Sequence, residues 1–115
     1  MQADDETRDF GINEWMDVSS FQNSWVNYGG TSANAAYCKD SNGMVYLRGR
    51  IKNGTLDSYA FTLPVGFRPQ YDLIFAVVSG AGLGRITVYS NGHVVPSSIG
   101  VNTSYPLNIP PFSVT

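Results

Sequence analysis

The chain has 115 residues, a net charge of −2 and one cysteine, Cys38. This length suits a single domain with a modest hydrophobic core. One cysteine excludes an intrachain disulfide and a cysteine-based zinc site, and no apolar run approaches the roughly 18 residues of a membrane-spanning helix. Charged residues make up only 14% of the chain and aromatic residues 13%. Together with frequent glycine, this composition predicts an all-β protein.

The charges are distributed unevenly along the chain. Residues 1–14 hold five carboxylates against one arginine, whereas residues 15–115 hold six cations against four carboxylates. Residues 15–115 are therefore mildly basic, but this positive charge is too small for a nucleic-acid-binding protein. Residues 1–13 lack hydrophobic periodicity and do not read as a secretory signal peptide. We predict a flexible lead-in, or a linker from an upstream segment, at 1–13 and a β domain over 14–115.

The first predicted strands cover residues 24–28 and 35–39, separated by a glycine-rich loop. A longer strand follows at 44–52, between two Asn-Gly turns that we expect to have positive φ at both central residues. Side chains alternate across a strand. The core-facing residues of 44–52 are therefore Val45, Leu47, Gly49 and Ile51, and the outward residues are Met44, Tyr46, Arg48, Arg50 and Lys52.

Five more strands are predicted in the second half of the chain. Side chains of residues 59–63 alternate between the two faces of a half-buried strand that ends at Pro64. Residues 72–79 are apolar on both faces, which indicates a central strand or one whose second face is covered by something else. A flexible loop is expected at 80–84. The next predicted strand, 85–89, has Ile86 and Val88 pointing inward. An Asn-Gly turn leads into a strand at 93–95, and prolines interrupt the last strand, 107–114. This count of short strands predicts an antiparallel β-sandwich, jelly-roll-like.

The sequence gives little support for catalysis. The single histidine, His93, lies beside a turn without a Gly-x-Ser-x-Gly motif, and Cys38 is expected to be a buried structural thiol. Asp40 and Asp57 flank neighbouring turns and are the pair that a glycan hydrolase would use. We interpret both as turn caps and expect no enzymatic activity, no cofactor and no metal site.

Binding is better supported, because several tyrosines lie beside loops where a ring could stack on a sugar. Our candidate surface consists of Asn27, Tyr28, Arg85, Tyr89, Asn91 and His93. The alternative is that both tyrosines pack inside a subunit interface. Separately, Arg48, Arg50 and Lys52 project from one strand face. This face would suit an anionic polymer such as a phosphate-bearing glycan, or it would be a solvated or inter-subunit face.

Four segments of the chain resemble the C-terminal head domains of bacteriophage tail fibres and receptor-binding proteins. They lie at residues 25–28, 37–55, 61–69 and 86–94, and the most specific is Leu63-Pro64-Val65-Gly66-Phe67-Arg68-Pro69. The resemblance implies a homotrimeric β-sandwich at the fibre tip, in the virion tail. It implies attachment to a bacterial cell-surface glycan, such as wall teichoic acid or a polysaccharide, without enzymatic activity. A structural trimerisation or capping domain without receptor binding is the alternative.

Overall fold

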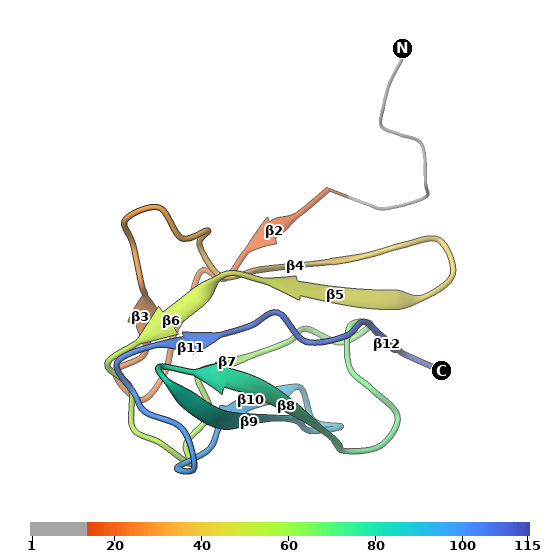
Figure 1. The fold of residues 1–115 in the computed structure, drawn as a ribbon. Coiled ribbons are helices and arrows are strands. Elements are labelled where there is room, and N and C mark those ends of the chain that lie inside the picture. Colours follow the sequence, from red (N-terminus) through yellow and green to blue (C-terminus); the bar gives the residue numbers. More distant parts are fainter. Residues whose placement is uncertain (1–13) are drawn as a thin grey trace.

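The computed structural model describes residues 14–115, and in that range the chain is all-β (Figure 1). The predicted all-β, antiparallel class is confirmed. The lead-in predicted at 1–13 lies outside the described residues. No helix in 14–115 has the length and apolar character needed to cross a membrane. The strands are β2 (Met16–Asp17), β3 (Val26–Asn27), β4 (Ala36–Lys39), β5 (Met44–Arg48), β6 (Arg50–Lys52), β7 (Phe61–Thr62), β8 (Leu73–Ser79), β9 (Gly82–Val88), β10 (His93–Pro96), β11 (Tyr105–Pro106) and β12 (Phe112–Ser113).

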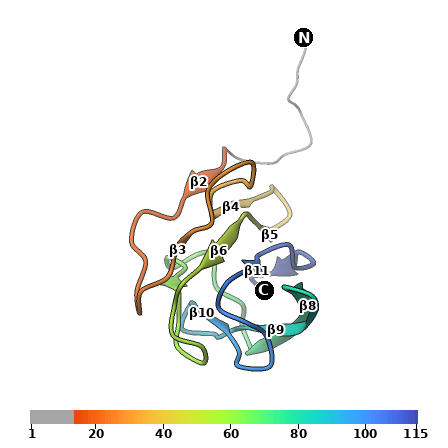
Figure 2. The same ribbon diagram turned by 60° about the vertical axis from the view of Figure 1, so that its left-hand side comes forward.

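These strands form three antiparallel sheets with the orders β12-β5-β4-β2, β11-β6-β3 and β7-β10-β9-β8. The first two sheets share one stretch of chain, because β5 continues into β6 across a single residue, Gly49. Figures 1 and 2 both place β2 and β4 on the side of the molecule opposite β9 and β10.

The predicted strand 44–52 is interrupted at Gly49. This residue has φ +108°, and a Cβ there would lie 2.6 Å from the carbonyl oxygen of Asn34. Only glycine tolerates both conditions without strain. The neighbouring backbone stays paired, since Leu107 donates to the Gly49 carbonyl and Arg50 donates to Ala33. The predicted alternation survives the break, with Val45, Leu47 and Ile51 buried.

The core lies between the sheets and is filled by aromatic and β-branched side chains. Trp25 and Tyr105 meet edge to face, with ring centroids 6.2 Å apart. Ile86 and Val88 point inward from β9, as the sequence predicted. Tyr105 also serves as a polar anchor: its hydroxyl accepts from the Arg85 N–H at 2.8 Å and lies 2.9 Å from the Ser97 carbonyl oxygen.

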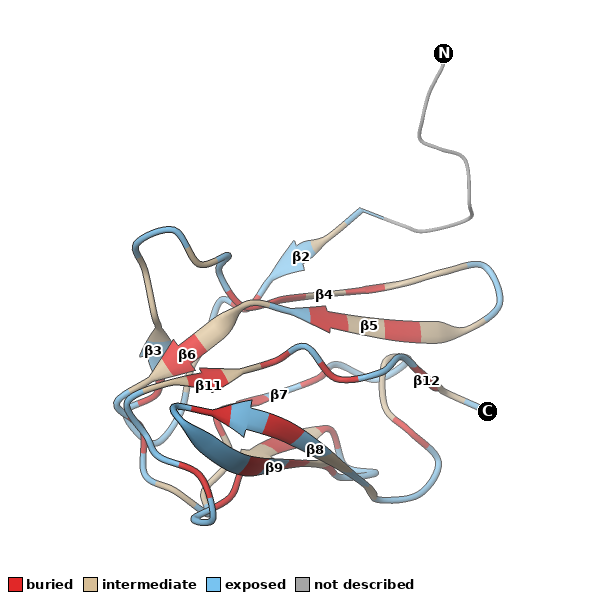
Figure 3. Ribbon diagram, viewed as in Figure 1, coloured by how far each residue is buried: buried red, intermediate tan, exposed pale blue. Residues whose placement is uncertain are grey.

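The structure contradicts the central-strand alternative for 72–79 and the loop expected at 80–84. β8 is an edge strand of its sheet, not a central one, and the ribbon of Figure 3 is coloured as exposed at alternate residues along it. Ile74 and Val78 are 67% and 69% exposed. The expected loop at 80–84 is instead a tight turn at Gly80 and Ala81, and β9 starts at Gly82 opposite Ser79.

The hairpin turns at 40–44 and 89–93 share one geometry. The two Asn-Gly turns that flank 44–52 differ from the prediction, because positive φ occurs only at Gly43 of the first and at Asn53 of the second. Positive φ occurs at Gly43 and Gly92 but not at the preceding asparagines. Asp40 donates its N–H to the Met44 carbonyl, as Tyr89 does to His93. This pattern is that of a turn closed by a glycine bulge. Backbone N–H groups, first that of Met44, donate to Asp40 and lower the pKa of its carboxyl group.

The corner at 64–69 is fixed by Arg68. Its Nε donates to the Leu63 carbonyl at 2.8 Å, which gives this arginine a structural role at the end of a strand. Gly92 lies directly beside the pair, because a Cβ there would be 2.5 Å from the Leu63 oxygen and 2.7 Å from Arg68 Nε. The segment 63–69, which is the most specific part of the resemblance to tail-fibre head domains, thus connects the end of β7 to the β9–β10 turn.

Candidate functional site

The six residues predicted as a binding surface lie in two different sheets. Asn27 ends β3 and Tyr28 follows it, in the sheet with β6 and β11, whereas Arg85, Tyr89, Asn91 and His93 belong to the β9–β10 hairpin. The structure therefore divides the predicted surface into two groups.

The amide oxygens of both asparagines are engaged within the protein. Asn27 Oδ1 accepts from the Ala35 N–H at 2.8 Å, and Asn91 Oδ1 accepts from the His93 N–H at 3.0 Å. These bonds fix the loop before β4 and the turn before β10. Both side chains thus have a structural role that the sequence pattern did not indicate.

The hairpin group contains a ring pair that sequence reasoning missed. His93 stacks on Tyr59, with centroids 3.9 Å apart and planes 4° from parallel. Tyr59 lies two positions before β7, and β7 pairs with β10, so the contact depends on strand pairing rather than on proximity in sequence. Tyr89 is 38% exposed and remains accessible on the same hairpin.

The other group is part of a cationic strip, which we define as Arg48, Arg50 and Lys52. Arg50 lies over the Tyr28 ring at 4.6 Å and Lys52 lies over the same ring at 5.3 Å. Arg48 lies over Trp15 at 4.4 Å. Cation–π contacts of this kind hold a cation in place while leaving its N–H groups free to donate. The strip is therefore an ordered array of donors.

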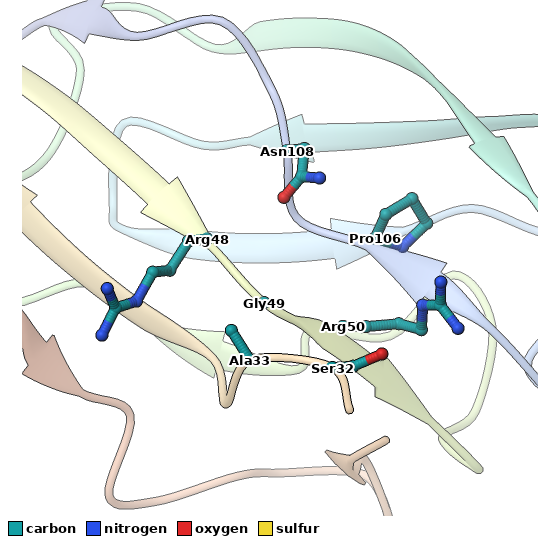
Figure 4. A pocket seen from close by; sticks show the side chains of 7 residues that line it. All are labelled: Ser32, Ala33, Arg48, Gly49, Arg50, Pro106 and Asn108. Carbon is teal, nitrogen blue, oxygen red and sulfur yellow. The ribbon is translucent and has the colours of Figure 1, made fainter. Parts of the chain in front are cut away.

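Two open hollows adjoin the cationic strip and together form one groove. They have volumes of about 230 and 390 Å³ and share Arg50, Pro106 and Asn108. Figure 4 shows the smaller hollow, where Arg48 and Arg50 leave the chain on either side of Gly49. The remaining lining residues are Ser32, Ala33, Val77, Val78, Gly80 and Ser104. The lining contains no carboxylate, so the groove is electropositive.

Asn108 and Pro106 reach this groove through pairing that the sequence pattern does not reveal. Pro106 is the register partner of Arg50 in the β11–β6 ladder, and Asn108 follows in the chain segment that leaves β11. None of the six predicted site residues lines the groove. The alternation of 44–52 predicts the three cations on one strand face. In the structure Arg48 ends β5, whereas Arg50 and Lys52 belong to β6, and Figure 4 shows Arg48 and Arg50 leaving the chain in opposite directions.

The carboxylates proposed for hydrolase chemistry are engaged with the backbone. Asp57 Oδ1 accepts from the Ser98 N–H at 2.8 Å, and Asp40 caps the 40–44 turn and accepts from the Tyr46 hydroxyl at 3.0 Å. Within 14–115 no three His, Cys, Asp or Glu side chains gather as metal ligands. Cys38 is buried, as predicted, and burial raises the pKa of its thiol.

Comparison of the chain with protein-family models, with curated proteins and with solved structures found no match.

Proposed function

We propose that residues 14–115 form a non-enzymatic attachment head of a phage tail fibre, or of a related prophage-encoded particle, and that this head binds a bacterial cell-surface glycan. The resemblance at 61–69 supports the class of protein. The observation that carries the binding role is the cationic strip, whose arginines lie over aromatic rings beside an electropositive groove. Ordered guanidinium groups suit anionic groups on a polymer.

We propose further that the head is a homotrimeric β-sandwich. The outer face of β8 and β9 supports self-association, since Ile74, Val78 and Leu83 are between 62% and 69% exposed. β8 carries no charge and no proline, the usual protections of an edge strand. Apolar surface of this kind is typical of an interface. Three copies would strengthen a weak glycan contact by about 10²–10⁴ through avidity.

A structural capping domain is the second candidate, and the same exposed face of β8 and β9 favours it, because that face alone would explain assembly. The two candidates differ in cell binding. We expect light scattering to give a trimer and the fluorescent chain to label some strains in a panel of bacteria. A trimer that labels no strain would support the capping role instead, and a monomer at micromolar concentration would contradict the homotrimer.

A further inference from the structure

Three Asn-Gly pairs lie in turns of the chain: Asn42-Gly43, Asn53-Gly54 and Asn91-Gly92. An asparagine before a glycine can cyclise, because the glycine has no side chain to hinder attack of its nitrogen on the asparagine amide. The two atoms must first come together, which rotates the backbone of the asparagine and displaces the glycine. The freedom of each glycine to move therefore governs how fast its asparagine reacts in the folded protein.

Gly54 is held by the core. It is buried, and a Cβ there would overlap the Trp25 ring. Asn102 holds the pair from the other side, since its carbonyl accepts from the Asn53 N–H at 2.7 Å and its Nδ2 donates to the Gly54 carbonyl at 3.1 Å. The Gly54 N–H itself donates to no carbonyl group within 14–115. Packing and Asn102, not a bond of this N–H, restrain the glycine.

Gly92 is held by the corner at 64–69. A Cβ there would lie 2.5 Å from the Leu63 carbonyl oxygen, and the Gly92 N–H donates to the Tyr89 carbonyl at 2.8 Å. The Asn91 side chain is held as well, because its Oδ1 accepts from the His93 N–H. Both groups that would have to meet are therefore fixed.

Gly43 is the least restrained of the three glycines. It is half-buried, and a Cβ there would meet only a Val114 methyl group, at 3.4 Å. Its N–H donates to the Asp40 carbonyl over 3.1 Å. The Asn42 side chain is exposed, and within 14–115 the bonds that Asn42 makes in this turn use its backbone N–H and leave its amide group free.

We propose that Asn42 is a site of spontaneous modification, where the chain cyclises to a succinimide that opens to aspartate or isoaspartate. The Gly43 nitrogen loses its proton to a base in solution and bonds to Asn42 Cγ, and the Cγ–Nδ2 bond breaks to release ammonia. Water then opens the ring. Its addition at Cγ leaves aspartate, whereas its addition at the backbone carbonyl carbon leaves isoaspartate, whose main chain runs through Cβ and Cγ. Neither the attachment role nor the oligomeric state is needed for this reaction.

The isoaspartate product would loosen the end of the chain. Its extra backbone carbon lengthens the 40–44 turn, where Asp40 Oδ1 accepts from the N–H groups of Asn42 and Met44. The Gly43 carbonyl also accepts from the Val114 N–H at 3.1 Å, and β12 pairs with β5 beside this turn (Figure 1). Modification of Asn42 therefore weakens the hold on residues 112–114.

Peptide mass mapping of the 115-residue chain, after incubation in warm, mildly alkaline buffer, tests the proposal. Trypsin separates the three pairs, because Arg48, Lys52 and Arg85 lie between them. Conversion raises a peptide's mass by about one unit, and isoaspartyl methyltransferase labels the isoaspartate. We expect Asn42 to convert roughly tenfold faster than Asn53 or Asn91, or more, since its glycine moves without opening the core. In concentrated urea, where no glycine is packed, the three should convert at similar rates.

Asn42→Ser is the control variant, because serine also suits a turn and lacks the reacting amide. Aged wild-type protein should melt a few degrees below fresh protein and exchange the Val114 amide proton faster, whereas aged Asn42→Ser should match its fresh sample. Conversion at Asn42 without either change would contradict the loosening of β12.

Two results of the mass mapping would overturn the assignment of Asn42. One is conversion at Asn53 as fast as at Asn42, which would mean that the unbonded N–H of Gly54 outweighs its packing. The other is an unmodified Asn42 in the folded chain under conditions where all three asparagines convert in urea, which would mean that the 40–44 turn protects it.

Discussion

The guanidinium carbon of Arg50 lies 4.6 Å from the centroid of the Tyr28 ring. This contact joins the strand that carries the cationic strip to the segment after β3, and Lys52 shares the ring at 5.3 Å. The sequence pattern predicts Tyr28 as a stacking platform for a sugar. In the structure Arg50 and Lys52 lie over its ring, and Arg50 also lines the groove.

Replacing Tyr28 by leucine should therefore weaken anion binding without unfolding the protein. A cation–π contact at a partly exposed site contributes about 0.5–1 kcal/mol, so we expect affinity for an anionic polymer to fall by roughly two- to fivefold. Titration calorimetry measures the change, and Tyr71→Leu is the control because Tyr71 is 73% exposed and lies outside the groove. Unchanged affinity in Tyr28→Leu would show that the ring does not position the arginines.

Gly49→Ala should destabilise the protein by at least about 1–3 kcal/mol, the cost of holding a non-glycine residue in an unfavourable backbone conformation. The added Cβ would also meet the Asn34 carbonyl. Gly82→Ala is the matched control, since a Cβ at Gly82 meets nothing within 4 Å. Urea denaturation of both variants gives the comparison. Equal stabilities would mean that the chain can rearrange at the junction of β5 and β6.

Arg68→Ala should lower the free energy of unfolding by roughly 1–3 kcal/mol, because it leaves the Leu63 carbonyl without its partner. Arg85→Ala, which removes an exposed arginine, should change stability by less than about 0.5 kcal/mol. Thermal melting distinguishes the two. An unchanged melting temperature in Arg68→Ala, together with lost cell binding, would make Arg68 a receptor contact instead of a corner residue.

Tyr105→Phe removes one oxygen atom from the core and should cost about 1–3 kcal/mol, since backbone groups of Ser97 and Arg85 lose a buried partner. Denaturant titration measures the loss, with Tyr71→Phe as an exposed counterpart. A stability equal to that of the wild type would indicate that water replaces the hydroxyl, and Tyr105 would then contribute only its ring packing.

Local patterns predict the strands that contain period-two alternation. Val45, Leu47 and Ile51 are buried as expected, and so are Ile86 and Val88. The same reasoning leaves the place of β8 undecided, because a run that is apolar on both faces does not tell a central strand from an edge strand with a second apolar face. It also fails at 80–84, where the glycines indicate a loop although most of this segment belongs to β9.

The candidate site is predictable only in part. Alternation predicts Arg48, Arg50 and Lys52 on one face of a continuous strand, but it does not predict the break at Gly49 that divides them between β5 and β6. Their ring partners and the opposite wall of the groove depend on pairing between distant segments, such as Leu107 with Gly49, and no local pattern encodes that pairing. Asn27 and Asn91 are candidates because of their amide groups, but sequence does not reveal that backbone N–H groups already occupy their oxygens.

The most direct test of the attachment role is flow cytometry of bacteria incubated with the fluorescent chain. We predict that the wild type labels a subset of strains, that added salt weakens the labelling through charge screening, and that a variant combining Arg48→Gln with Arg50→Gln loses it while remaining folded and trimeric. Failure of the wild type to label any strain, or labelling by the double variant at the wild-type level, would contradict attachment through the cationic strip.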